Sequence, residues 1–263
     1  MNILISNDDG IYANGIKSLC EALSSSYDVY LIAPNQERSA AGHSITLNSP
    51  LRVEELGPLY GSKRSWAVSG TPGDCVKIGV NAVLSDDEKP DIIISGINHG
   101  PNLGHDVIYS GTVSCAIEGA MMNIPSIAVS LNSYKPEFED FTFTATFIKS
   151  LIPKLKDFKF PEKSILNINV PGIPQDEING IVVTEMGGRM FTDNYEKRID
   201  PRGKTYYWMA GKLSTEKENE KSDIYAIRQN KISISPLTFN LTRKDVLDDL
   251  NSVLCKDNLC NWF

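Results

Sequence analysis

Two adjacent carboxylates, Asp8 and Asp9, follow an apolar run close to the start of the chain (NILISNDDG). Neighbouring residues of a regular strand point to opposite faces of the sheet, so both side chains can serve one site only if the strand has already ended. Gly10 favours such a tight exit. Two close carboxylates repel each other unless one is protonated or a divalent cation binds both, and oxygen ligands suit Mg²⁺, Mn²⁺ or Ca²⁺. An Asp-rich turn or a helix N-cap is the alternative interpretation.

A second segment with chemical potential, residues 95–112, connects an expected strand to an expected helix. Its length and its four glycines are not typical of a plain connector. It ends in Ser110, Gly111 and Thr112, whose hydroxyls and free backbone N–H groups form an anion site at the start of a helix. A metal beside a phosphate explains this segment and the acidic pair together. For Thr112 alone, a simple N-cap is the alternative.

The chain has three histidines, His43, His99 and His105, and all three fall in loops that follow expected strands. His99 or His105 could donate a proton to a phosphate or to a leaving oxygen. A solvated loop histidine is the alternative for each of these two. We interpret His43 as structural.

The elements that must position these groups alternate between strands and helices in the first part of the chain. We expect strands at Asn2–Ser6, Tyr27–Ala33, Ser65–Val68, Asp91–Ser95 and Ser126–Leu131, and helices at Ala13–Leu23, Thr71–Val83, Thr112–Met122 and Phe138–Leu155. Continuously apolar strands that alternate with helices predict a Rossmann-like, doubly wound α/β fold with a mostly parallel sheet. In such a sheet, ligands bind at the carboxyl ends of the strands. We therefore expect the acidic pair and residues 95–112 to share one rim.

The pattern changes after about residue 160. We expect strands at Ile165–Val170 and Ile181–Thr184, two hairpin arms at Thr205–Ala210 and Ile224–Ile234 with a polar loop at Ser214–Asp223 between them, and a last helix at Thr242–Leu254. No internal repeat or long linker interrupts the chain. The sequence therefore predicts a single domain over residues 1–263, with a Rossmann-like core in 1–160 and a C-terminal β-hairpin and helix extension in 161–263.

Composition narrows the class of protein. The chain has 263 residues, 41% of them hydrophobic, and a formal net charge of −7. This acidic balance argues against a protein that coats a nucleic-acid polymer by neutralising its phosphates, but it leaves room for a small phosphorylated ligand. No apolar run approaches the roughly 18 residues of a membrane span, and no signal peptide is visible. We expect a cytoplasmic protein with free thiols, and a disulfide or metal at Cys255 and Cys260 stays open.

Several common signatures are absent from the sequence, among them G-x-G-x-x-G after the first strand, the P-loop, H-E-x-x-H and G-x-S-x-G. Four long segments are recognisable together: ILISNDDGIYANGI, APNQERSAAGHSITL, SGTPGDCVKIG and PDIIISGINHGPNLGHDVIYSGTVSCAIEGAMMNIPSIAVS. They resemble the survival protein SurE family of 5′/3′-nucleotidases. The segments NINVP, VVTEMG and 223–237 extend this resemblance into the second half of the chain.

The resemblance implies a metal-dependent phosphomonoesterase that hydrolyses nucleoside 5′- and 3′-monophosphates, with short polyphosphate as a side activity. It implies one divalent cation per subunit, Mg²⁺ or Mn²⁺, held by four residues: Asp8, Asp9, Ser39 and Asn98. It also implies a homodimer or homotetramer in which C-terminal elements are exchanged. Neither a nucleic-acid polymer nor a membrane is an expected partner.

Our mechanistic hypothesis is direct attack by a metal-oriented water. Asp8 and Asp9 then act as catalytic residues as well as ligands, and the expected phosphate or substrate contacts are Asn102, Ser110, Gly111, Thr112 and His105. An aspartyl-phosphatase is one alternative, but its D-x-D-G-T motif would place Asn7 at the nucleophile and Ile11 at the threonine. A non-catalytic nucleotide sensor on the same fold is the other alternative.

Overall fold

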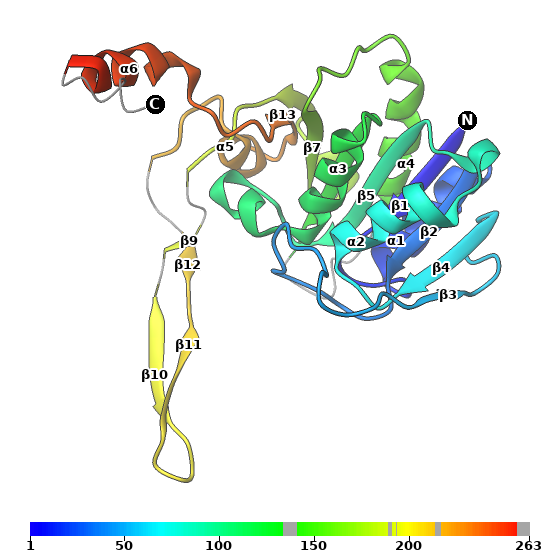
Figure 1. Cartoon of the computed structure of the whole chain (residues 1–263), viewed down its shortest axis with the longest axis horizontal. Coiled ribbons are helices and arrows are strands. Elements are labelled where there is room, and N and C mark those ends of the chain that lie inside the picture. Colours follow the sequence, from blue (N-terminus) through cyan, green and yellow to red (C-terminus); the bar gives the residue numbers. More distant parts are fainter. Residues whose placement is uncertain (134–140, 189–190, 193, 214–216, 257–263) are drawn as a thin grey trace.

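One nine-stranded sheet organises the chain (Figure 1), in the order β3-β4-β2-β1-β5-β6-β7-β13-β8. The computed structural model describes residues 1–133, 141–188, 191–192, 194–213 and 217–256. The strands of this sheet are β1 (Asn2–Ser6), β2 (Asp28–Pro34), β3 (Val53–Glu55), β4 (Arg64–Val68), β5 (Ile92–His99), β6 (Ser126–Asn132), β7 (Ser164–Pro171), β8 (Ile181–Val183) and β13 (Ile232–Thr238). The six strands from β4 to β7 in this order run parallel, while β3 and β13 are antiparallel to β4 and β7. The predicted mostly parallel α/β fold is confirmed.

Helices cover both faces of this sheet. The helix α1 (Asn14–Ser24) and the helix α4 (Phe141–Leu151) share one apolar core, whereas α2 (Pro72–Ile78) and α3 (Gly111–Met121) contribute to cores on the other face. Within β1, Ile3 and Ile5 belong to the first core and Leu4 to the second. The strand is therefore apolar throughout because successive side chains enter opposite cores.

The helix α1 lies directly against the end of β5. A Cβ atom added at Gly15 would lie 1.8 Å from the carbonyl oxygen of Ile97, so only glycine fits there. This close approach holds the start of α1, and with it the turn that precedes the helix, next to the carboxyl end of β5.

The structure corrects the predicted pairing in the second half. Residues 223–228 form the helix α5 (Asp223–Arg228), whose N-cap Ser222 accepts a hydrogen bond from the backbone N–H of Tyr225, and residues 232–238 form β13 of the main sheet. The prediction of a hairpin arm at Ile224–Ile234 was therefore wrong. Its β-branched residues suggested a strand, but Ile224 and Ile227 are three residues apart and pack together at helical spacing.

The predicted strand at Thr205–Ala210 does form a hairpin, but with a different partner. The strand β11 (Thr205–Met209) pairs antiparallel with β10 (Tyr195–Ile199). Next to it, β9 (Phe191–Thr192) pairs with β12 (Lys212–Leu213). The hairpin and the helix α6 (Leu247–Lys256) extend away from the main body in different directions (Figure 1).

Several element ends differ from the prediction. The strand β5 runs on to His99 instead of ending at Ser95, and its pairing with β6 shifts in register between Ser95 and Asn98. Three expected helices contain a turn of another helical type at one end. The helices expected at 71–83 and 138–155 end in such turns, at Gly79–Val83 and Ile152–Leu155. The helix expected at 242–254 begins with one, at Lys244–Val246. Residues 138–140 and 214–216 of the predicted elements lie outside the described residues.

Two further sequence predictions concern membrane spans and cysteines. In the part of the chain that the structure describes, no helix is long and apolar enough to cross a membrane. The expected free thiols are confirmed for Cys20, Cys75 and Cys115, which are buried. The expectation was wrong for Cys255, which is disulfide-bonded, and Cys260 lies outside the described residues.

Candidate active site

The acidic pair leaves the sheet through a turn that Asn7 closes. The buried Asn7 amide donates to the carbonyl oxygen of Gly10 at 2.9 Å and accepts from the backbone N–H of Gly10 at 3.2 Å. Gly10 has a φ of +101°, which L side chains rarely adopt. Because both ends of the Asn7 side chain are engaged, Asn7 is a turn residue, and the place of an aspartyl nucleophile is filled by a group that cannot act as one.

Asp8 contacts the first turn of α3. The Thr112 hydroxyl donates to Asp8 Oδ1 at 2.5 Å, and a Cβ atom added at Gly111 would lie 2.6 Å from the Asp8 Cβ atom. The Oδ1 atom of Asn98 lies 3.3 Å from the same hydroxyl. A hydroxyl has one proton, which goes to the nearer carboxylate, so the Asn98 oxygen keeps its lone pairs. The Asn98 amide nitrogen donates to the Gly100 carbonyl at 2.9 Å, which fixes the orientation of the amide.

Asp9 and Ser39 complete the set of predicted ligands. The Asp9 carboxylate accepts a hydrogen bond from the backbone N–H of His99 at 3.3 Å. Ser39 is exposed on the loop after β2, and its hydroxyl donates to Glu37 Oε1 at 2.7 Å. This bond uses the proton of Ser39 and leaves its oxygen lone pairs free to bind a cation.

Three of the four predicted ligands, Asp8, Ser39 and Asn98, line one cavity of about 210 Å³. Its lining residues are Asp8, Ser39, Ala40, Asn98, His99, Asn102, Asp106, Tyr109 and Ser110. Asp9 lies outside this lining, but its carboxylate is hydrogen-bonded to the backbone of the lining residue His99. His105 is exposed and lies outside this lining, although the same 3₁₀ turn (Gly104–Tyr109) carries the lining residues Asp106 and Tyr109.

Two residues that the sequence analysis did not assign, Asn167 and Asn169, hold Asn102 in place. Both amide nitrogens donate to the Asn102 carbonyl at 2.9 Å, and Asn169 Oδ1 accepts from the Asn102 backbone N–H at 2.8 Å. The Asn102 side chain donates to the Ser130 hydroxyl at 2.7 Å, which leaves a second amide proton for a ligand. The signal was present in NINVP, because two asparagines spaced two apart on a buried strand need polar partners on one face.

A buried carboxylate from the second half supports the rim. Asp223 accepts hydrogen bonds from the backbone N–H groups of Gly104 at 2.9 Å and Gly187 at 2.8 Å. A Cβ atom at Gly104 would lie 2.0 Å from the Gly188 carbonyl oxygen, so the two backbones are in direct contact. The 3₁₀ turn of the site is therefore anchored to the chain that leads into the β-hairpin.

The electrostatics of the acidic pair are unfavourable without a cation. Burial raises the pKa of Asp8, and the Thr112 hydroxyl and the first N–H groups of α3 oppose this rise. Burial raises the pKa of Asp9 to about 7, and the negative charges of Asp8 and Glu37 add to the effect. No described lysine or arginine forms an ion pair with either carboxylate. A divalent cation would neutralise this charge.

The donor set fits a hard divalent cation. Two carboxylates, one amide oxygen and one hydroxyl give oxygen ligands only, which suits Mg²⁺ or Mn²⁺. Within the described ranges, no three His, Cys, Asp or Glu side chains form a cluster that could hold a metal on their own. A cation here therefore depends on Ser39 and Asn98 in addition to the acidic pair.

Comparison with known proteins adds independent information. A family model described as "Survival protein SurE" matches residues 3–193. The chain is 45% identical over 260 residues to the 5′-nucleotidase SurE of Thermosynechococcus vestitus (97% of each chain covered) and 46% identical over 263 residues to that of Pelotomaculum thermopropionicum (99% and 98% covered). The crystal structure of the SurE protein from Aquifex aeolicus is similar at a TM-score of 0.84 and 37% identity, with 96% of this chain and 99% of that chain covered.

The raised pKa of Asp9 predicts a pH-dependent gain in stability for Asp9→Asn. Between about pH 4 and pH 7 the folded protein keeps a proton on Asp9 that the unfolded chain has lost, so the free energy of unfolding falls as the pH rises. In EDTA, Asp9→Asn should therefore melt at least about 2 °C above the native chain at pH 8, with a smaller difference at pH 5. Thermal unfolding checks this, with the exposed Asp176→Asn as the control. An equal shift at both pH values would contradict the interpretation.

The hydrogen bond from Thr112 to Asp8 predicts a difference between two substitutions. Thr112→Val keeps the shape of the side chain but removes the proton donor, and a hydrogen bond to a charged group contributes about 1.5–3 kcal/mol. We expect kcat/KM for the reaction at this site to fall about 10- to 100-fold in Thr112→Val. Thr112→Ser keeps the hydroxyl and should stay close to the native rate. Similar rates in both variants would show that the bond has no part in the reaction.

Proposed function

The chain belongs to the survival protein SurE family, and we propose that it hydrolyses nucleoside 5′-monophosphates to a nucleoside and phosphate with one divalent cation per subunit. Similarity over nearly the full length to relatives named 5′-nucleotidase supports an enzyme of that class. The observation that carries the metal-dependent mechanism is the convergence of oxygen donors from the turn after β1, the loop after β2 and the end of β5 on one cavity at the carboxyl edge of the sheet.

The proposed roles of the acidic pair follow from their contacts. A divalent cation held by Asp8, Asp9, Ser39 and Asn98 would, when bound, supply charge neutralisation and an activated water for attack on phosphorus. Asp8 is held by the hydroxyl of Thr112 and is therefore a fixed ligand. Among the described residues, Asp9 accepts from one weak backbone donor at 3.3 Å, so its other oxygen is proposed to accept a hydrogen bond from the attacking water.

The phosphate contacts are also proposals. Ser110 lines the cavity, and its oxygen accepts from the Val113 N–H, so its proton is free to donate to a phosphate oxygen. Asn102 has a second amide proton for the same purpose. Gly111 and Thr112 contribute the positive end of an 11-residue helix. His105 is proposed as a contact to the outer part of the substrate, because its turn also carries Asp106 and Tyr109.

We also propose that 3′-monophosphates and short polyphosphate are hydrolysed. The donors named above address the phosphate group alone, so their recognition does not depend on which sugar hydroxyl carries it. A non-catalytic nucleotide sensor would use the same phosphate contacts, but it would not need a pair of carboxylates facing an anionic ligand.

Release of phosphate from a panel of substrates tests the function. AMP, 3′-AMP and tripolyphosphate are each incubated with Mg²⁺, with Mn²⁺ and with EDTA, and inorganic phosphate is measured. We expect hydrolysis with Mg²⁺ or Mn²⁺, none in EDTA, and a loss on the order of 10³-fold in Asp9→Asn. Binding of AMP by calorimetry without release of phosphate in either metal would support the sensor. Activity of Asp9→Asn in EDTA would rule out the metal-dependent mechanism.

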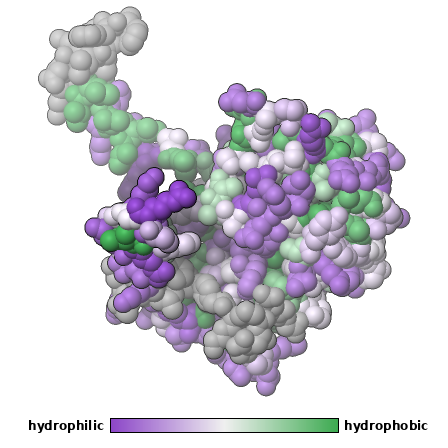
Figure 2. Space-filling model, turned by 90° about the horizontal axis from the view of Figure 1, so that it is seen from below, coloured by the Kyte–Doolittle hydropathy of each residue, from purple (hydrophilic) through white to green (hydrophobic). Residues whose placement is uncertain are grey.

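We propose in addition that the chain forms a homodimer or homotetramer through its C-terminal extension. The hairpin exposes apolar side chains, with Trp208 at 59% and Met209 at 69%, and α6 exposes Leu250 and Val253 at 55% and 59%. Figure 2 shows apolar residues gathered near α6, apart from the main body. Exposed apolar surface of this kind is typical of an interaction site, and an arm that extends from the body is suited to exchange between copies.

A substitution that introduces a negative charge on the hairpin tests this association. Because Trp208 is exposed within a single chain, Trp208→Glu should leave the fold of the chain intact and disrupt only a contact between chains. We expect the native chain to sediment as a dimer or tetramer and Trp208→Glu to sediment as a smaller species. The control is Lys197→Glu, which changes charge on the neighbouring strand of the same hairpin. A native chain that sediments as a monomer would contradict the proposal.

A further inference from the structure

The loop that carries Ser39, residues 35–50, is held by polar contacts and not by burial. Ile45 and Leu47 are 43% and 80% exposed, so apolar packing contributes little to its position. Its backbone contacts include Arg38 N–H to the Asp8 carbonyl at 2.7 Å and Gly42 N–H to the Tyr109 carbonyl at 3.1 Å. The position of Ser39 therefore depends on a small number of hydrogen bonds.

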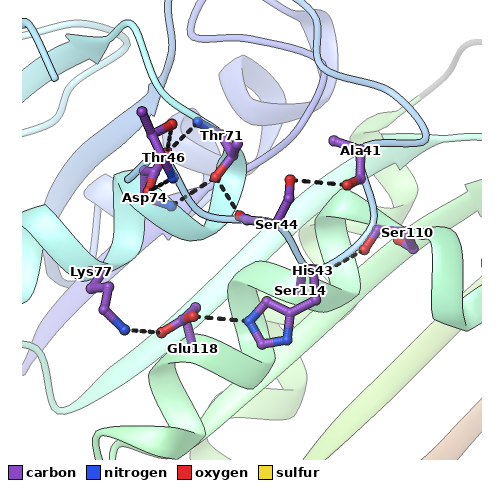
Figure 3. Close-up of polar contacts among 10 residues, drawn as sticks. All are labelled: Ala41, His43, Ser44, Thr46, Thr71, Asp74, Lys77, Ser110, Ser114 and Glu118. Carbon is purple, nitrogen blue, oxygen red and sulfur yellow. Dashed lines mark hydrogen bonds and ion pairs between the residues drawn. The ribbon is translucent and has the colours of Figure 1, made fainter. Parts of the chain in front are cut away.

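Two buried carboxylates on neighbouring helices bind the part of this loop that follows Ser39, at His43 and Thr46 (Figure 3). Asp74 of α2 accepts from the Thr46 hydroxyl at 2.6 Å and from the Thr46 backbone. Glu118 of α3 accepts from His43 Nε2 at 2.9 Å and from Lys77 Nζ at 3.3 Å. His43 is thus the side chain through which the loop reaches α3, and it lies four residues after Ser39.

The bond between His43 and Glu118 is energetically demanding to break. Glu118 is 3% exposed, and its pKa is lowered, first by the hydrogen bond from His43 and then by Lys77, so it is a buried carboxylate in its charged form. A buried charge is tolerated only when it is paired and hydrogen-bonded. If the loop moved away from α3, Glu118 would keep the more distant Lys77 as its one partner among the described residues.

The helix α3 contacts both Asp8 and the loop that carries Ser39. The first turn of α3 holds Asp8 through Thr112, and Glu118 lies six residues further along, about 9 Å up the helix axis. A hydrogen bond from the loop to Glu118 therefore fixes a second point of the loop relative to Asp8, in addition to the bond from the Arg38 N–H to the Asp8 carbonyl. Ser39 and Asp8 line the same cavity. The distance between the loop and Asp8 therefore decides whether the Ser39 hydroxyl oxygen and the Asp8 carboxylate can bind one cation.

We propose that His43 is a positioning residue for cation binding: its hydrogen bond to Glu118 holds the loop so that Ser39 reaches the cation bound by Asp8 and Asp9. The inference rests on the proposed function, because it takes Ser39 as a ligand. This role goes beyond a merely structural one, and it requires no direct contact between His43 and the cation or the substrate.

Three substitutions separate this role from a general effect on the fold. In His43→Gln the amide nitrogen reaches the place of Nε2 and can still donate to Glu118, whereas in His43→Asn it reaches only the place of Nδ1. Lys77→Gln is the matched control, because it removes the other partner of Glu118 from α2 without touching the loop. Thermal unfolding confirms that each variant is folded.

Binding of Mn²⁺ is measured without substrate, from the paramagnetic resonance signal of the free ion. We expect His43→Asn to raise the Kd for Mn²⁺ at least about fivefold, and His43→Gln and Lys77→Gln to stay within about twofold of the native chain. In a Ser39→Ala background, His43→Asn should cause no further loss, because the ligand that it positions is already gone.

Failure of the inference and failure of the proposed function give different results. Native Kd in His43→Asn, or an equal loss in Lys77→Gln, would overturn the positioning role while the metal site stands. A full additional loss in the Ser39→Ala background would also overturn it, because His43 would then act independently of Ser39. No binding of Mn²⁺ by the native chain would overturn the metal site itself, and the inference with it.

Discussion

The placement of two carboxylates side by side in a largely buried turn is the constraint on which the site depends. Burial raises the pKa of both carboxylates, and the negative charge of Asp8 adds to the rise for Asp9. The fold offsets this with neutral donors: the Thr112 hydroxyl and the first N–H groups of α3 for Asp8, and the backbone of His99 for Asp9. Neutral donors reduce the cost without cancelling the charge, which is why a cation is proposed to bind here.

Rigid elements surround this charge. Gly111 lets the start of α3 approach Asp8, and Gly15 lets α1 approach the end of β5, where Asn98 lies. Behind the cavity, Asn167 and Asn169 bind the backbone of Asn102 from β7. Each of these contacts depends either on a glycine, which allows two backbones to approach, or on a buried asparagine amide. The geometry of the site is therefore set by the packing around the sheet and not by exposed side chains. The loop with Ser39 is the exception, because it lies outside this packing.

Most of the architecture followed from apolar patterning, because strands such as Ile3–Ile5 are buried on both faces and leave no ambiguity. Patterning failed where local composition and tertiary partners disagree. Ile224 and Ile227 are β-branched and favour a strand by composition. They form a helix because both side chains pack with Leu103 when they are spaced three residues apart on one helical face. The pairing of β11 with β10 could not be foreseen, since both strands are exposed and carry no alternation that marks a core.

The acidic pair and the start of α3 were visible from residue types. Ser39 and Asn98 came from resemblance alone, and Asn167 and Asn169 were missed because an asparagine on an apolar strand does not reveal which backbone it will bind.

The raised pKa of Asp9 couples two equilibria. Below about pH 7 the Asp9 carboxylate holds a proton, and a cation bound at the proposed site would displace it, so binding would release protons to the solvent. The affinity for such a cation would therefore fall as the solution becomes more acidic, and its binding would acidify a weakly buffered solution. A pair of neighbouring carboxylates in a turn would thus link binding of a cation to the proton concentration, through equilibrium binding alone and without any movement of the fold.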